Sequence, residues 1–462
     1  MLGGNIIYGI VTTGLTFYYQ SVIFLPAIFI SFLTVFIKVA DIVKDPFIGA
    51  YMDKTVGRRG KFIPYLRVVP AITCILTVLL FINKIYGIRN SGLENALIAL
   101  TATITYLIWS VVFSLGEIPL NSLPPLMTDN ESQRNGLMAS SRFFGTIGFG
   151  LISIFLIPAA SYLGSVIAER TGDRDTGFQY GFIITVIILT LIGGVPLLFP
   201  GLIIKEKIKS VSSDKEAFSF KQSFEAMWSC KPYRRLMLSC LLRSPTVVFS
   251  VVQATMFVYY FGNNGSGGYV IYMLIYSLVT FLGQGTAMLL TPKLAARFNK
   301  RKIMVACNIA LTAVFLSMYV LYRIFPYSLH LAIPFTLFSF IGLLMGICFG
   351  ITAVLIPIMI ADALDIYEAE YNKRPDGIFF SGMTMTGKLG YGISAVIVGI
   401  VFAAVGFSGD GVQAVNAALY EGAVFRTDEI FGIYRSAIFI LSSIPPAIGA
   451  LLSVIPLINR RR

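Results

Sequence analysis

The sequence has few charged residues and almost no residues that bind metals. Only 13% of its 462 residues are Asp, Glu, Lys or Arg, whereas a soluble domain has roughly 25%. A soluble chain of this length would need more polar surface, so lipid must cover most of the outside. The single histidine, His330, has no second His or Cys nearby, which argues against a zinc or haem site. We therefore expect no cofactor.

The cysteines and the motif scan give no sign of an enzyme. None of the five cysteines belongs to a CxxC pair or a metal-binding spacing, so we expect packing roles for them. The sequence also lacks a GxSxG elbow, an HExxH motif, a P-loop and a GxGxxG motif after a strand. We expect no enzymatic activity, and without an ATP site any uphill transport would have to use an ion gradient.

Twelve apolar segments are long enough to cross a bilayer, which takes about 20 residues. They lack the period-two alternation of barrel strands, so we expect an all-α integral membrane protein. The expected spans are residues 2–20, 24–52, 64–84, 95–122, 136–163, 178–204, 234–262, 268–292, 302–323, 331–361, 377–406 and 433–458. The first has almost no flank before it, so either this helix is short or the true start lies upstream.

The net charge of +13 comes from Lys and Arg clustered between the apolar segments. They gather in alternate loops, so we expect those loops and both termini to lie in the cytoplasm. We expect the protein to lie in the plasma membrane. Because the basic residues belong to these loops, their excess does not indicate nucleic acid as a partner. The longest basic loop divides the chain into a bundle of six helices at 1–204, a central loop at 205–233 and a second bundle at 234–462. A weak repeat, Pro46 to Asp53 and Pro292 to Asn299, supports two related halves.

The second span carries four charges in eight residues, at Lys38, Asp41, Lys44 and Asp45. Ionisable residues inside a membrane are costly and usually functional. Two carboxylates one turn apart repel each other, so they need a bound cation, a proton or a basic partner. The pattern favours a cation-coupling site, and the alternative is a self-neutralised patch that fixes helix packing.

Further charges lie inside other spans, at Glu117, Arg142, Arg243 and Lys388. Arg142 could bind solute, or it could snorkel and anchor a loop. Lys388 needs an anion, and it could equally be half of an ordinary buried ion pair. The sequence leaves Arg243 open between a pore-lining and a structural role.

Two motif clusters resemble a known family. Residues 41–49 (DIVKDPFIG) are followed by Asp53, Arg58, Lys61 and Pro64, and residues 361–368 (ADALDIYE) by Arg374, Asp376, Gly377 and Lys388. Both are similar to motifs of the glycoside–pentoside–hexuronide:cation symporters, which are melibiose-permease-like members of the major facilitator superfamily. The resemblance covers nearly the whole chain. It implies a monomeric protein with twelve transmembrane helices in two six-helix bundles. The implied mechanism is alternating access between the bundles.

The resemblance also implies roles for individual residues. The cation-coupling set is Asp41, Asp45, Lys44 and Lys388, with H⁺ or Na⁺ as the coupling ion. The substrate-binding set is Asn5, Ser114, Glu117, Asn121, Arg142 and Thr384. The gating and loop motif comprises Asp53, Arg58, Asp362, Asp365, Glu368 and Arg374. The implied solute is a sugar, a glycoside or a hexuronate.

The sequence departs from the family at the sites that matter most. Lys44 replaces an asparagine near the cation, so its ammonium could take over the role of sodium and leave proton coupling or facilitated diffusion. Asn121 and Ala353 replace sugar-site tryptophans, and Asn5 is neutral. A different solute, such as an organic anion or an amphipathic lipid, therefore remains the alternative.

Overall fold

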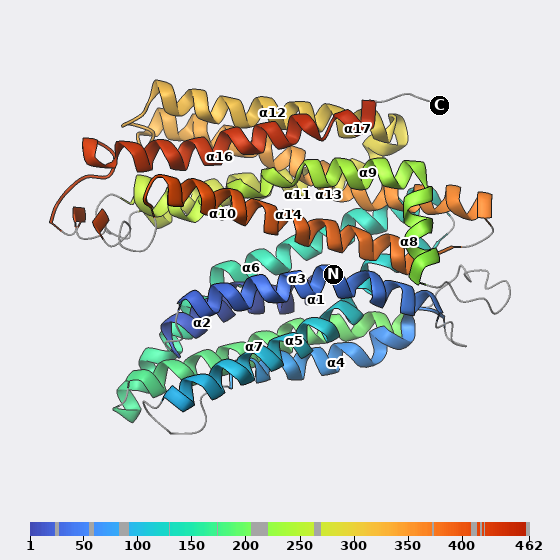
Figure 1. The fold of residues 1–462 in the computed structure, drawn as a ribbon, viewed down its shortest axis with the longest axis horizontal. Coiled ribbons are helices and arrows are strands. Elements are labelled where there is room, and N and C mark those ends of the chain that lie inside the picture. Colours follow the sequence, from blue (N-terminus) through green and yellow to red (C-terminus); the bar gives the residue numbers. More distant parts are fainter. Residues whose placement is uncertain are drawn as a thin grey trace. The chain divides into compact units, whose positions relative to one another are not determined.

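We describe a computed structural model of the chain (Figure 1). The described residues are 1–23, 27–54, 60–82, 92–128, 130–172, 174–204, 220–262, 269–371, 374–407, 414–415, 418–419 and 421–458. The regular elements in these ranges are all helices. They form two compact units, one of residues 1–229 with 361–385 and the other of residues 230–360 with 386–462.

The first unit contains the N-terminal helices and the adjoining ends of two later ones. Its elements are α1 (Leu2–Gly9), η1 (Ile10–Gly14), α2 (Leu15–Ser21), α3 (Ala27–Lys54), α4 (Ile63–Leu79), α5 (Gly92–Ser122), η2 (Pro124–Leu126), α6 (Glu131–Thr171), α7 (Arg174–Ile203) and α8 (Phe220–Ser229). Within this unit α3 packs against α5, α4 packs against α5 and α7, and α1 packs against α6 and α7 (Figure 1).

The second unit contains most of the remaining helices. Its elements are α9 (Lys231–Leu242), η3 (Ser244–Thr246), α10 (Val247–Thr255), η4 (Met256–Phe261), α11 (Tyr269–Arg297), α12 (Lys300–Ile324), most of α13 (Ala332–Tyr371) and of α14 (Asp376–Ala404), η5 (Glu429–Phe431), α16 (Gly432–Leu452) and α17 (Ile455–Ile458). Here α16 packs against α10 and α12. The end of α13 and the start of α14 belong to the first unit.

Nine helical segments of the described chain are long and apolar enough to cross a membrane. They coincide with the fourth to twelfth expected spans. The first three expected spans correspond to α1–η1–α2, to α3 with its charged residues, and to the shorter apolar helix α4. The expectation of an all-α multi-pass membrane protein is confirmed. The division at 1–204, 205–233 and 234–462 stays a prediction, because residues 205–219 lie outside the described ranges.

Each unit buries an apolar core and also exposes large apolar side chains. Phe32 and Leu191 of the first unit are 66% and 65% exposed, and Ile333 of the second is 75% exposed. A water-soluble protein rarely presents so many such residues together, whereas acyl chains solvate them. Small residues let helices approach closely: a Cβ on Gly181 of α7 would lie 2.5 Å from the Cα of Gly164 on α6.

The two halves share local features at matching positions. The first span of each half contains a π-helical stretch, η1 in one and η4 in the other. The side chain of Asn299 caps α12 by accepting the backbone N–H of Arg301 at 3.0 Å. Its counterpart in the weak sequence repeat, Asp53, also caps a helix, but a distant one. The capping of a distant helix by Asp53 forms part of the candidate site described below.

Candidate functional site

The charged residues of α3 form one cluster around the ammonium of Lys44. Asp41, Lys44 and Asp45 share a face because they are three and four residues apart. The Lys44 Nζ lies 2.8 Å from Asp41 Oδ1 and 3.3 Å from Asp45 Oδ1. A basic partner of the two carboxylates therefore comes from their own helix.

Helix α5 supplies two further oxygens to the same ammonium. Lys44 Nζ donates to Ser114 Oγ at 2.7 Å and to the backbone carbonyl of Ser110 at 2.9 Å. The hydroxyl of Ser110 in turn donates to Asp41 Oδ1. A single positive nitrogen thus has four oxygen neighbours drawn from two helices, which is the donor set expected of a small cation site.

Because the cluster is buried, its stability depends strongly on the balance of its charges. Asp45 is fully buried and Asp41 is 5% exposed, and ions in such places are costly unless they are paired. Counting two carboxylates and one ammonium leaves one negative charge. The hydroxyl of Thr384 on α14 also donates to Asp45 Oδ2, at 3.3 Å. The neighbouring Lys38 lies apart, with its Nζ 5.6 Å from the ring centre of Tyr8.

The next turns of α5 hold the arginine of α6. Arg142 Nη2 donates to Asn121 Oδ1 at 3.0 Å, and Asn121 Nδ2 donates to the carbonyl of Glu117 at 3.0 Å. The Glu117 carboxylate is close enough to attract the guanidinium. The same guanidinium also reaches Met383 Sδ at 3.7 Å. The structure therefore brings Glu117, Asn121 and Arg142 together, and their predicted role in solute binding stays a prediction.

Two further predicted residues are Asn5 and Lys388. The Asn5 amide donates to the carbonyl of Met1 in its own helix at 3.1 Å, and its Nδ2 would be 2.8 Å from a Cβ on Gly145, one turn after Arg142. Lys388 belongs to the second unit. Its predicted contact with the acids of α3 stays a prediction.

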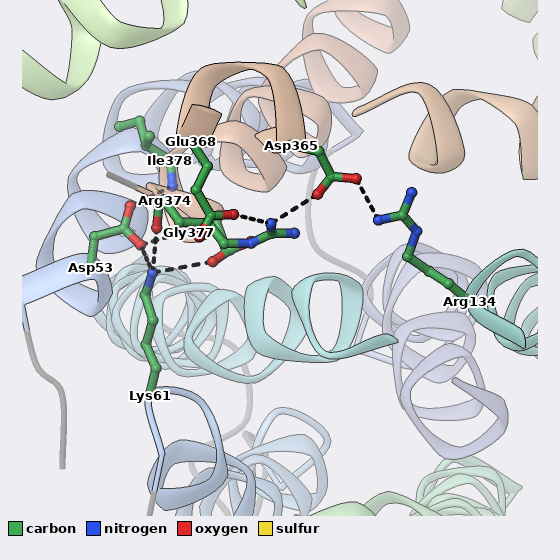
Figure 2. Close-up of polar contacts among 9 residues, drawn as sticks. Asp53, Lys61, Arg134, Asp365, Glu368, Arg374, Gly377 and Ile378 are labelled. Carbon is green, nitrogen blue, oxygen red and sulfur yellow. Dashed lines mark hydrogen bonds and ion pairs between the residues drawn. The ribbon is translucent and has the colours of Figure 1, made fainter. Parts of the chain in front are cut away.

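A second charged cluster joins the end of α3 to the start of α14 (Figure 2). Asp53 accepts the backbone N–H groups of Gly377 at 2.9 Å and of Ile378 at 3.0 Å. These are among the first donors of a helix and have no partner within it, so the carboxylate caps α14 from a distant helix. Lys61 forms an ion pair with Asp53, and its Nζ lies 3.7 Å from Asp376 Oδ2.

Arg374 forms hydrogen bonds with several carboxylates near this capped end of α14 (Figure 2). It donates to Asp365 at 2.8 Å and to Glu368 at 2.5 Å through Nη1, and to Asp376 at 3.1 Å through Nε. Burial alone lowers the pKa of Arg374, but the nearby carboxylates outweigh it and raise the pKa above its usual value. The guanidinium therefore stays charged at every physiological pH.

Arg134 at the start of α6 extends the network. It donates to Asp365 Oδ2 at 2.6 Å and to Asp362 Oδ1 at 3.1 Å. The two aspartates are 41% and 31% exposed at their side chains, so this outer part is reachable by water. Every described member of the predicted loop motif takes part in the network. Arg58 lies outside the described residues.

The backbones of α3 and α14 approach closely where the network is buried. A Cβ on Gly377 would lie 2.5 Å from the Gly49 carbonyl oxygen, and one on Gly49 would lie 2.6 Å from the Gly377 carbonyl oxygen. Both distances are impossible for a real side chain, so only glycine fits at either position. This close approach lets the Asp53 carboxylate reach the first amides of α14.

Ser110 of the first cluster was not predicted from the sequence. Ser110 binds Asp41 and Lys44, and it lies four residues before Ser114 on the same face of α5. A pair of serines at this spacing, inside a span and opposite the charged helix, is the signal that could have found it. The close approach of Gly49 and Gly377 had no such signal, because it depends on packing of distant segments.

Together the fold and the buried charges define a multi-pass helical membrane protein with paired carboxylates inside a span. A family model described as MFS/sugar transport protein matches residues 1–421, so the chain belongs to this family.

Similar proteins include two transporters and one solved structure. The isoprimeverose transporter of Lactiplantibacillus pentosus is 25% identical over 415 residues, which are 89% of this chain and 80% of that protein. The lactose permease of Lactobacillus delbrueckii subsp. bulgaricus is 24% identical over 422 residues, 90% of this chain and 61% of that one. The Escherichia coli fucose:proton symporter FucP has the same fold, with a TM-score of 0.59, 14% identity, and coverage of 96% and 95% of the two chains.

Proposed function

We propose that this protein is a secondary transporter, not an enzyme, that couples the uptake of a sugar or glycoside to a cation by alternating access between two six-helix bundles. Family membership supports transport, and the names of the relatives support a sugar solute. We place it as a monomer in the plasma membrane with both termini in the cytoplasm. The alternative solutes are an organic anion and an amphipathic lipid.

The observation that carries the proposal is that Lys44 forms ion pairs with both Asp41 and Asp45 inside the membrane span. A charged site of this kind is costly inside a membrane and suits a group whose charge changes during a transport cycle. Helix α5 links it to the proposed solute residues, since Ser114 contacts the ammonium and Asn121 holds Arg142. Because both sets of residues contact α5, filling one site would alter the other through this helix.

The coupling ion in this proposal is a proton. The Lys44 ammonium already has the oxygen neighbours that a sodium ion would need. In the set of Asp41, Asp45 and Lys44, two carboxylates share one ammonium, and protonating one carboxylate would balance the charge of these three residues. The same ion pairs of Lys44 also favour a second candidate function. In this function the protein is a facilitator, and no cation moves with the solute.

The network around Arg374 is the proposed gate. Its ion pairs join α3 and α6 to the end of α13 and the start of α14. Alternating access requires contacts on one side of the membrane to break and re-form. The half-exposed pairs of Arg134 suit the opening step, and the buried pair of Asp53 with Lys61 suits the fixed part of the joint.

The test compares uptake with exchange in proteoliposomes. Asp45→Asn should abolish accumulation of a labelled sugar against its gradient while leaving counterflow at half or more of the wild-type rate. Wild-type accumulation should respond to a pH gradient and not to sodium. Unchanged accumulation in Asp45→Asn would show that this carboxylate takes no part in coupling, and loss of counterflow with the protein still folded would point to solute binding instead.

A further inference from the structure

Arg243 occupies a break in the helical span from Lys231 to Phe261. It is the C-cap of α9, and its backbone carbonyl accepts the N–H of Thr246 at 2.9 Å in the short turn that follows. Pro245 in this turn has no N–H and interrupts the helical bonding pattern. The break lies near the middle of the span. Discontinuous helices at this depth commonly border the solute sites of transporters.

The Arg243 guanidinium has no anionic partner in the part of the chain that the structure describes. Its Nη1 is buried and makes no hydrogen bond. The sequence contains no Asp or Glu between Glu225 and Asp362. The other acids of the second unit all lie between the end of α14 and the start of α16. The spanning helices of this unit therefore offer no carboxylate to neutralise the arginine.

The described surroundings of the Arg243 guanidinium are an aromatic ring and thiols, which carry no formal charge. The guanidinium carbon lies 5.5 Å from the ring centre of Phe349, and the thiols of Cys240, Cys307 and Cys348 are close enough to interact with its charge. Thiols and an aromatic face do not compensate a buried cation as an ion pair does.

Two more buried polar side chains of the second unit also lack hydrogen-bond partners. The Ser244 hydroxyl, next to Arg243, makes no hydrogen bond although it is buried. Asn308 follows Cys307, is fully buried, and has neither amide atom hydrogen-bonded. Buried polar groups normally find partners, and those that do not call for a ligand or another explanation.

We propose that Arg243 and Ser244 form an anion-binding site and that the transported solute carries a carboxylate or a phosphate group. Arginine binds both groups through two parallel N–H bonds. The identification of the anion as part of the solute rests on the proposed transport function, whereas the anion site itself does not. Neither residue belongs to the charged clusters of the first unit, so this site adds a selectivity element to the second.

The first experiment measures binding to the purified full-length protein in detergent. The probes are glucuronate, galacturonate and glucose 6-phosphate, each compared with glucose or galactose. Wild type should bind at least one acidic sugar about tenfold more tightly than its neutral partner, the size expected of a charge-assisted hydrogen-bonded contact. Arg243→Gln should reduce the ratio of acidic to neutral sugar affinity to about one. Preference for the phosphate ester over the uronates would assign a phosphorylated solute, and the reverse order a carboxylate.

Two controls separate the proposal from a general charge effect. Arg323→Gln removes an exposed arginine from the same unit and should keep the preference. Arg243→Lys retains the charge but not the planar fork, and should keep part of it. The proposal is overturned if wild type shows no preference for any acidic probe, or if the preference survives in Arg243→Gln.

A second measurement distinguishes a binding role from a structural one. If Arg243 only packs on Phe349, Arg243→Met should lower the melting temperature of the protein without ligand. If it is an uncompensated charge kept for an anion, the variant should be as stable as wild type or more stable. Sugar counterflow by the wild type tests the transport function separately. The anion site stands if acidic probes bind through Arg243 even when no sugar exchanges.

Discussion

The ammonium of Lys44 lies 2.8 Å from the carboxylate of Asp41, its neighbour one turn earlier on the same helix. The same nitrogen is 3.3 Å from Asp45 and is held by two oxygens of α5. A tethered cation therefore occupies a position where a free cation would find the same oxygens. Because a tethered ion cannot leave, the proposed coupling requires that a different charge, a proton, binds and leaves.

Replacing Lys44 with Asn should create sodium dependence. The change removes the ammonium and leaves Asp41 and Asp45 a turn apart with no positive partner from α3, so a cation from solution becomes favourable. We expect uptake by Lys44→Asn to rise about tenfold when sodium replaces potassium, while wild-type uptake does not respond. Labelled sodium binding to the purified variant checks the same point directly.

The matched control is Lys38→Asn. It removes the same charge from the same helix, but Lys38 lies over the ring of Tyr8 and does not touch the two aspartates. It should stay independent of sodium. A wild-type protein that requires sodium would contradict the tethered-cation interpretation, as would a folded Lys44→Asn variant that binds none.

Removing the charge of Asp53 should destabilise the joint between α3 and α14. Asp53→Asn removes an ion-pair partner from the Lys61 ammonium, which is 2% exposed and otherwise lies 3.7 Å from Asp376 Oδ2 and 3.4 Å from the Arg374 carbonyl. Breaking a buried pair by removing one partner costs about 3 kcal/mol, and the two amides of α14 lose a charged acceptor. We expect a lower melting temperature. Adding Lys61→Met to Asp53→Asn should restore part of the loss, and a double variant as unstable as the single one would argue against the pair.

A methyl group at Gly377 should force α3 and α14 apart. The new Cβ would meet the Gly49 carbonyl oxygen at 2.5 Å, and a backbone atom cannot rotate away. We expect Gly377→Ala to cost about 1–3 kcal/mol in stability and to slow transport. Gly392→Ala in the same helix has open space around its Cβ and should be neutral or gain up to about 1 kcal/mol. Equal melting temperatures for the two variants would contradict the close approach.

Most of the fold could be predicted from the sequence because membrane helices leave a strong signal. Runs of about 20 apolar residues fix where helices lie, and the twelve expected spans match helices of the structure. The charged stripe of Asp41, Lys44 and Asp45 was also visible, because helical spacing alone puts these residues on one face.

The contacts between distant segments could not be predicted in the same way. That Asp53 caps α14 depends on the meeting of Gly49 and Gly377, which are far apart in the chain. The sequence left open which positive group would neutralise the acids of α3, and the structure places the Lys44 ammonium against both of them. The role of Arg243 was open because the absence of a partner becomes informative only when burial is known.

Arg374→Lys tests whether the network needs the shape of arginine or only its charge. Arginine reaches Asp365 and Glu368 through Nη1 and Asp376 through Nε, and a lysine ammonium cannot reproduce this planar fork. We expect the variant to be about 1–3 kcal/mol less stable. Arg323→Lys, at an exposed position, should change stability little.

The pH dependence of this variant follows from the raised pKa of Arg374. A group with a raised pKa contributes stability that is complete below its unfolded-state pKa and is lost only as the pH rises through the folded value. For arginine the pKa of the unfolded state already lies far above physiological pH. The difference in melting temperature between wild type and Arg374→Lys should therefore stay constant from about pH 6 to pH 9. A difference that shrinks steadily across this range would mean that the guanidinium is not permanently charged and that the carboxylates around it are not its partners.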